Sequence, residues 1–199
     1  MKFLVPYDFT EVTRTALDHA LAMAPAFDAK IEVFHIIKSE SDRAHAEKQI
    51  EELISGLAAG EKSRVYGKIQ VGNIFKDISK EAEDGDAHLL VMGTHGAHGL
   101  QKIFGSHAIK VVSSSNTPFL ITQEKGPEDI MRIMMAVNLT KESVQIVKYA
   151  SELAKKFRAE IHLLCQPESD EFLQHQLKNN ITRARQYLVK EGVAHEVDV

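Results

Sequence analysis

Val91-Met92-Gly93-Thr94-His95-Gly96-Ala97-His98-Gly99-Leu100-Gln101-Lys102-Ile103-Phe104-Gly105-Ser106 places four glycines between an apolar run and a helical pattern. The run before it, residues 87–92, is short and almost wholly apolar, which predicts a buried strand closed by Gly93. After Ser106, a good N-cap residue, apolar side chains recur at spacings of three and four and predict a helix. The stretch therefore indicates a strand, a glycine loop and a helix, in that order.

A glycine loop between a strand and a helix suits an anion. Without Cβ atoms the backbone can approach a phosphate, and the first amides of the helix point outward without partners. We therefore expect a phosphate ester as ligand. The glycine spacing matches neither the P-loop nor the dinucleotide fingerprint. The alternative is that these glycines serve only turn geometry or close packing of helix on strand.

Composition excludes several classes of protein. The chain has 199 residues, 44% of them hydrophobic and 26% charged, as in ordinary globular proteins. The net charge is −4 with scattered basic residues, which argues against nucleic acid or an anionic membrane as partner. No apolar segment approaches 18 residues. Cys165 is the single cysteine, which excludes an internal disulfide and favours the cytoplasm.

Strand and helix patterns alternate along residues 1–123. Strands are predicted at residues 3–5, 31–37, 65–71, 87–92 and 118–122, and helices at 10–27, 41–57, 74–83 and 106–115. This alternation predicts an α/β fold, a doubly wound five-stranded parallel sheet with helices on both faces. Such sheets bind ligands beyond the carboxyl ends of their strands. Asp8, after the first strand, and the loop that begins at Gly93 should therefore be neighbours.

The chain also contains a repeat. Residues 131–140 align with residues 1–10 without a gap, and the constant offset of 130 continues through Ala150 on Ala20 and Ile161 on Ile31. This predicts a duplicated domain. We expect a first domain at 1–123, a linker at 124–130 containing Gly126-Pro127, and a partial second copy at 131–199. That copy, truncated inside its third strand, should expose a strand edge.

The combined motifs resemble the universal stress protein family in its tandem two-domain form. They are Val5-Pro6-Tyr7-Asp8-Phe9-Thr10, Val71-Gly72-Asn73-Ile74, the glycine loop with Gly105-Ser106, and Thr117-Pro118-Phe119-Leu120-Ile121. The resemblance implies a nucleotide-binding α-hydrolase-like (Rossmann-like) sheet of order 3-2-1-4-5. It also implies ATP or a related adenine nucleotide as ligand, with Mg²⁺ beside it.

The resemblance assigns roles by position. Phosphates and ribose would lie at the glycines and Ser106, Asp8 would contact the nucleoside, and Ile36 would lie against adenine. The expected nucleotide-binding residues are Pro6, Asp8, Thr10, Ile36, Met92, Gly93, His95, Gly96, Gly105 and Ser106. No catalytic residue and no metal site are assigned, because no nucleophile–base pair and no set of metal ligands stands out.

Two departures from the family pattern keep a second hypothesis open. Eight residues rather than nine separate Gly96 from Gly105, and His107 follows Ser106 where a further hydroxyl is expected. The first hypothesis is a regulatory stress-response module that binds nucleotide and hydrolyses ATP slowly at most. The second is a nucleotide-independent interaction module that pairs through its fifth strand. Its partner would be the second domain or another copy of the chain.

Overall fold

The computed structural model describes residues 1–93, 117–123 and 125–198, and these fall into two compact units, Met1–Pro127 and Glu128–Val199. Unit 1 contains one five-stranded sheet of order β3-β2-β1-β4-β5, in which every pair of neighbours is parallel. The strands are β1 (Lys2–Pro6), β2 (Lys30–Ile37), β3 (Val65–Val71), β4 (Leu89–Gly93) and β5 (Phe119–Thr122). The predicted fold class and strand order are confirmed.

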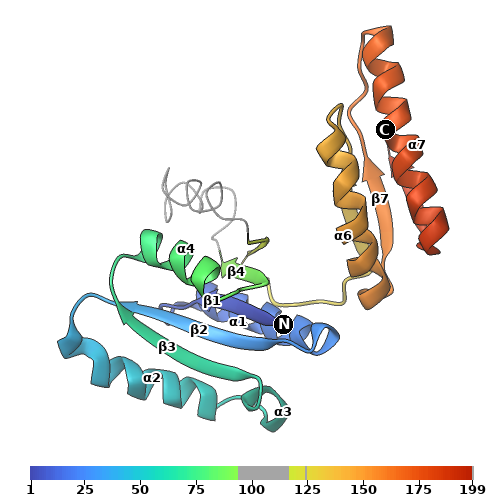
Figure 1. Ribbon diagram of the computed structural model, residues 1–199. Helices are drawn as coiled ribbons and strands as arrows, with labels where there is room; N and C mark the ends of the chain where they lie inside the picture. The colour runs from blue at the N-terminus through green and yellow to red at the C-terminus, as the bar shows by residue number, and fades with distance from the viewer. Residues whose placement is uncertain (94–116, 124, 199) are drawn as a thin grey trace. The chain divides into compact units, whose positions relative to one another are not determined.

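Helices cover both faces of this sheet (Figure 1). They are α1 (Glu11–Phe27), the 3-10 turn η1 (Glu40–Asp42), α2 (Arg43–Ser55), α3 (Ala59–Lys62) and α4 (Ile74–Asp84). Side chains alternate between faces along a strand. Phe3 accordingly packs on Phe27 of α1, with ring centroids 5.7 Å apart, while Leu4 packs with Ile78 and Ala82 of α4. Both layers bury apolar side chains, the main stabilising contribution in such a fold.

Two predicted elements differ from the structure. The single helix predicted at 41–57 is divided, because the chain enters through a 3-10 turn capped by Ser39 and leaves α2 at Gly56. Leu57 is then buried, and a separate turn of helix follows as α3. The strand predicted from residue 87 begins at Leu89, since the Ala87 amide bonds the Ala82 carbonyl at 3.0 Å and so completes the end of α4. The predicted helix at 106–115 lies outside the described residues.

Unit 2 repeats the first half of unit 1. It contains β6 (Arg132–Ala136), α6 (Lys141–Phe157), β7 (Glu160–Leu164), α7 (Glu171–Glu191) and β8 (His195–Asp198). Its three strands pair in parallel in the order β6-β7-β8. The register Lys2↔Lys30 recurs as Arg132↔Glu160, and α6 has the bounds of α1 displaced by 130 residues.

The core of unit 2 lies on one face of its sheet. Met135, Ile161 and Leu163 pack against α6 and α7 through a cluster that includes Val147, Ala184 and Leu188. On the opposite face Met134 is 65% exposed and Leu164 is 44% exposed. In the part of the chain that the structure describes, no helix is long and apolar enough to cross a membrane.

Candidate functional site: a pocket at the carboxyl edge of the sheet

A pocket opens at the carboxyl ends of the central strands of unit 1. It receives residues from the ends of β1, β2 and β4 and from the first turns of α1 and α4. Its lining residues are Pro6, Tyr7, Asp8, Thr13, Phe34, Ile36, Ile74, Ile78, Met92 and Gly93. The strand order brings these segments together, because β1 lies between β2 and β4.

Asp8 occupies a tight turn between β1 and α1. Its Oδ1 accepts hydrogen bonds from the Thr10 amide at 3.1 Å, the Thr10 hydroxyl at 2.6 Å and the Thr13 hydroxyl at 2.9 Å. Thr10 in turn caps α1, its hydroxyl accepting from the Thr13 amide at 3.4 Å. Among the described residues no hydrogen bond reaches Asp8 Oδ2. One carboxylate oxygen therefore holds the turn, and the other is available to a ligand.

Phe9 continues this turn with a φ of 65°, a left-handed conformation that is uncommon for an aromatic residue. Its ring packs edge-on against Tyr7 and His35, at centroid distances of 5.2 and 4.9 Å. His35 Nδ1 lies 2.6 Å from the Tyr7 carbonyl oxygen, so this nitrogen carries the proton and donates it. Burial raises the pKa of Tyr7 above its usual value. These contacts fix the segment that presents Asp8.

Most of the other lining residues of the pocket are apolar. Phe34 and Met92 are buried there, whereas Ile74 at the start of α4 is 49% exposed. Ile36 lies at the end of β2, opposite Gln70 in the sheet register. The pocket thus combines one carboxylate with an extended apolar surface, which suits a ligand with a flat apolar part and a polar part.

Gly93 ends β4 directly against α1. A Cβ atom at this position would lie 2.2 Å from the Val12 carbonyl oxygen and 2.6 Å from Val12 Cγ1. Close packing of strand on helix therefore requires glycine here, whether or not a ligand binds. This glycine has the packing role that the sequence left open as an alternative.

Five of the ten residues expected to bind nucleotide line this pocket: Pro6, Asp8, Ile36, Met92 and Gly93. Thr10 does not line it and acts through its bonds to Asp8. His95, Gly96, Gly105 and Ser106 lie outside the described residues. The sequence reasoning missed Tyr7, Thr13, Phe34, Ile74 and Ile78. Thr13 and Ile74 had a usable signal, since Thr13 is one turn after Thr10 and Ile74 ends a motif already singled out.

Comparisons with known proteins identify the family of this chain. The model of the universal stress protein family matches residues 1–123. The chain belongs to the universal stress protein family. Universal stress protein MJ0531 of Methanocaldococcus jannaschii is 27% identical over 143 residues, which is 64% of this chain and 84% of that protein. Universal stress protein MJ0577 of the same organism is 27% identical over 158 residues, covering 63% and 96% of the two chains.

The fold likeness extends over both units. A solved universal stress protein from Archaeoglobus fulgidus superposes with a TM-score of 0.73 at 20% identity, covering 98% of this chain and 76% of that one. The functionally unknown protein PA1789 from Pseudomonas aeruginosa gives a TM-score of 0.66 at 16% identity, covering 100% and 74%. At these identities the likeness shows the universal stress protein fold alone.

Unit 2 contains a turn like the Asp8 turn of unit 1, but without the negative charge. Asn138 stands where Asp8 stands in unit 1, and its Oδ1 accepts from the Thr140 amide at 2.9 Å and the Thr140 hydroxyl at 2.8 Å. Asn180 of α7 donates to the Asn138 carbonyl at 2.9 Å. The turn therefore forms with an amide as well as with a carboxylate, so its geometry does not need the negative charge of Asp8.

Proposed function

We propose that unit 1 binds an adenine nucleotide, ATP or a close relative, as a regulatory stress-response module. The observation that carries this proposal is the convergence of Asp8 and an apolar wall in one pocket at the carboxyl edge of the sheet. The wall offered by Phe34, Ile36 and Met92 suits a purine base. Asp8 Oδ2 suits the ribose hydroxyls or a Mg²⁺ ion bound with the phosphates.

The phosphates would follow β4 beyond Gly93. The family motif assigns them to the glycine loop, with Gly96, Gly105 and Ser106 as contacts, and with His95 beside it. Backbone amides in such a loop bind phosphate oxygens without requiring a cationic side chain. This role of the loop rests on its sequence pattern and on the position of β4 beside the pocket.

The same pocket favours binding over catalysis. Its lining residues in the described part of the chain include one carboxylate and neither histidine nor cysteine, so they provide no nucleophile–base pair. We therefore propose a cytoplasmic module that reports on nucleotide through its conformation or its pairing, with slow ATP hydrolysis at most. We also propose that residues 131–199, after a linker at 124–130, form a partial second domain of the same family.

Two measurements on the purified full chain test nucleotide binding. Denaturation of the purified protein should release ATP or ADP, which mass spectrometry detects. Calorimetric titration with MgATP should give a dissociation constant that rises about tenfold or more in Asp8→Asn, since a bond to a charged group contributes about 1.5–3 kcal/mol. Asn138→Ala is the matched control, because it alters the corresponding turn in unit 2. Absence of binding to the wild type at millimolar MgATP would reject the proposal.

A second candidate function has its own observation. β5 pairs with β4 and with no other strand among the described residues, and Ile121 on it is 39% exposed. An open strand edge with an exposed apolar side chain can pair with another copy of the chain or with a second universal stress protein domain. In this case the chain would act as an interaction module independent of nucleotide.

A further inference from the structure

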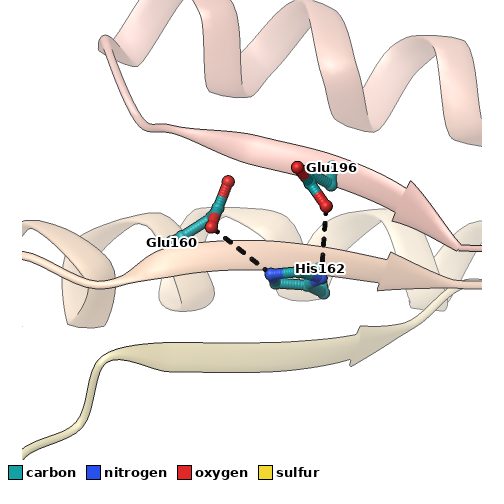
Figure 2. A group of neighbouring side chains, drawn as sticks. All are labelled: Glu160, His162 and Glu196. Carbon is teal, nitrogen blue, oxygen red and sulfur yellow. Dashed lines mark ion pairs between the residues drawn. The ribbon is translucent and has the colours of Figure 1, made fainter.

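A polar cluster lies on the face of unit 2 that α6 and α7 leave uncovered. Along β7, Ile161 and Leu163 point into the core, so Glu160 and His162 point to the other face. The pairing of His162 with Glu196 and of Leu164 with Asp198 places both carboxylates of β8 beside the imidazole. Figure 2 shows His162 between Glu160 on its own strand and Glu196 on the neighbouring one.

The distances in this cluster are those of a compact ligand set. His162 Nε2 lies 3.4 Å from Glu160 Oε2, and Nδ1 lies 3.9 Å from Glu196 Oε2. One ligand atom from each of these three residues lies within 4.8 Å of the other two. Ligands bound to one metal ion at about 2.0–2.2 Å are about 3–4 Å apart. Glu160 already faces Nε2, and rotation of the Glu196 side chain from Nδ1 toward Nε2 would bring all three onto one ion.

The imidazole is also held as in a metal-binding histidine. Nδ1 lies 3.0 Å from Asp198 Oδ2, so it donates its proton to that carboxylate. The side chain of His162 is 16% exposed, and its Nε2 is buried and accepts no hydrogen bond among the described residues. Histidines that bind metal commonly donate one ring nitrogen to a carboxylate, which fixes the other nitrogen as the ligand.

On the corresponding face of unit 1, lysine side chains pair with the carboxylates. There the buried Glu32 is paired with Lys2 at 2.9 Å, and Glu81 of α4 is paired with Lys68 at 2.6 Å. Unit 1 thus neutralises its carboxylates with its own lysines. At an offset of 130, Lys30 becomes Glu160, Glu32 becomes His162, Tyr66 becomes Glu196 and Lys68 becomes Asp198.

These replacements leave three carboxylates around one imidazole. A proton on His162 supplies one positive charge, which does not balance them. No ion pair in the described part of unit 2 joins Arg132, on the neighbouring strand, to any of the three. A bound cation would supply the missing charge, and a divalent ion would also link β7 to β8.

We propose that Glu160, His162 and Glu196 bind a divalent metal ion of the Zn²⁺ class, with Asp198 orienting the imidazole. Mixed imidazole and carboxylate ligands suit zinc and its neighbours better than Mg²⁺ or Ca²⁺. Three protein ligands leave a fourth position for water. The site lies outside the nucleotide pocket and does not depend on it.

Zn²⁺ titration of the full chain against a chromophoric chelator tests the site. His162→Gln and Glu196→Gln should each weaken binding of one Zn²⁺ by at least about tenfold. Asp198→Asn should weaken it by about 10- to 100-fold, as the loss of an orienting partner does. Glu196 is 63% exposed, so its variant should fold normally, which circular dichroism checks.

His175→Gln is the control, because His175 is an exposed histidine of α7 outside the cluster. It should bind Zn²⁺ like the wild type. Co²⁺ substitution gives an independent signature, since a visible absorption band of tetrahedral Co²⁺ should appear in the wild type and in His175→Gln but not in His162→Gln. Equal Zn²⁺ affinity and stoichiometry in the wild type, His162→Gln and Glu196→Gln would overturn the proposal.

Discussion

Gly93 at the end of β4 lies so close to Val12 of α1 that a Cβ atom there would come within 2.2 Å of the Val12 carbonyl oxygen. The obstacle is backbone in the second residue of a helix, which cannot move aside as a flexible side chain can. This contact sets how closely the end of β4 can approach α1. The same residue also lines the candidate pocket.

Gly93→Ala should destabilise unit 1 by about 1–3 kcal/mol, the usual cost of forcing an atom into a packed region. Thermal and urea unfolding measure it. Gly60→Ala is the matched control, because a Cβ on Gly60 in α3 would meet nothing within 4 Å. That variant should be neutral or more stable by up to about 1 kcal/mol, since alanine favours helix. Equal effects of the two substitutions would contradict the packing explanation.

Substitutions of Asp8 can distinguish the effect of its hydrogen bonds on stability from the effect of its negative charge. Asp8→Ala removes the acceptor of three hydrogen bonds and should cost about 1–2 kcal/mol of stability, as the loss of a helix-capping side chain does. Asp8→Asn should cost less than about 0.5 kcal/mol, because Asn138 supports the same turn in unit 2. Urea unfolding measures the free energy of unfolding of both variants and of the wild type. If both lose stability equally, the amide does not replace the carboxylate in this turn.

The ion pairs beneath α4 should make unit 1 sensitive to acid. Burial of Glu81 raises the pKa of its carboxyl, but hydrogen bonds with Lys68 and Glu32 and the charges of Lys68 and Lys2 together outweigh this and hold the pKa below its usual 4.5. A carboxyl whose pKa is lower in the folded state stabilises the fold above its unfolded pKa. This stability is lost as the pH falls below about 4.5 and through the folded pKa.

Glu81→Gln tests this dependence. At pH 7 the variant should be less stable by about 1–3 kcal/mol, the contribution of a hydrogen bond to a charged group. Urea unfolding at pH 7 and near pH 3.5 should show the difference between variant and wild type shrinking in acid. Glu83→Gln, an exposed neighbour on α4, serves as control. An unchanged difference at both pH values would exclude the ion pairs as its source.

Pairing through β5 predicts an effect on oligomeric state. Ile121→Lys places a charge on the exposed edge strand, which disfavours pairing with another strand. Size-exclusion chromatography with light scattering should show a dimer for the wild type and a monomer for this variant. Met134→Lys, on the exposed face of unit 2, is the control and should leave the dimer intact. A monomeric wild type would exclude pairing of β5 with another copy of the chain.

Local sequence patterns predicted much of the fold because each reports a local physical cause. The apolar runs gave strands β2 and β3 almost to the residue, and Thr10 marked the cap of α1. The division of the helix predicted at 41–57 was missed: the segment begins with a 3-10 turn capped by Ser39, and α2 ends at Gly56. Asp8, Ile36 and Met92, which the family resemblance names as nucleotide-binding residues, line the candidate pocket. Phe34 and Ile78 were missed, because apolar residues carry no sign of which pocket they will line.

The alternation of strand and helix patterns along residues 1–123 predicted, by itself, the parallel α/β sheet that the structure shows, and the offset of 130 residues predicted a duplicated domain. Only the tertiary structure decided that Gly93 packs on Val12 and that Glu160, His162 and Glu196 meet. The physical reason is distance along the chain. Periodicity and turn chemistry act over a few residues, whereas these contacts depend on strand register and helix docking between segments more than thirty residues apart.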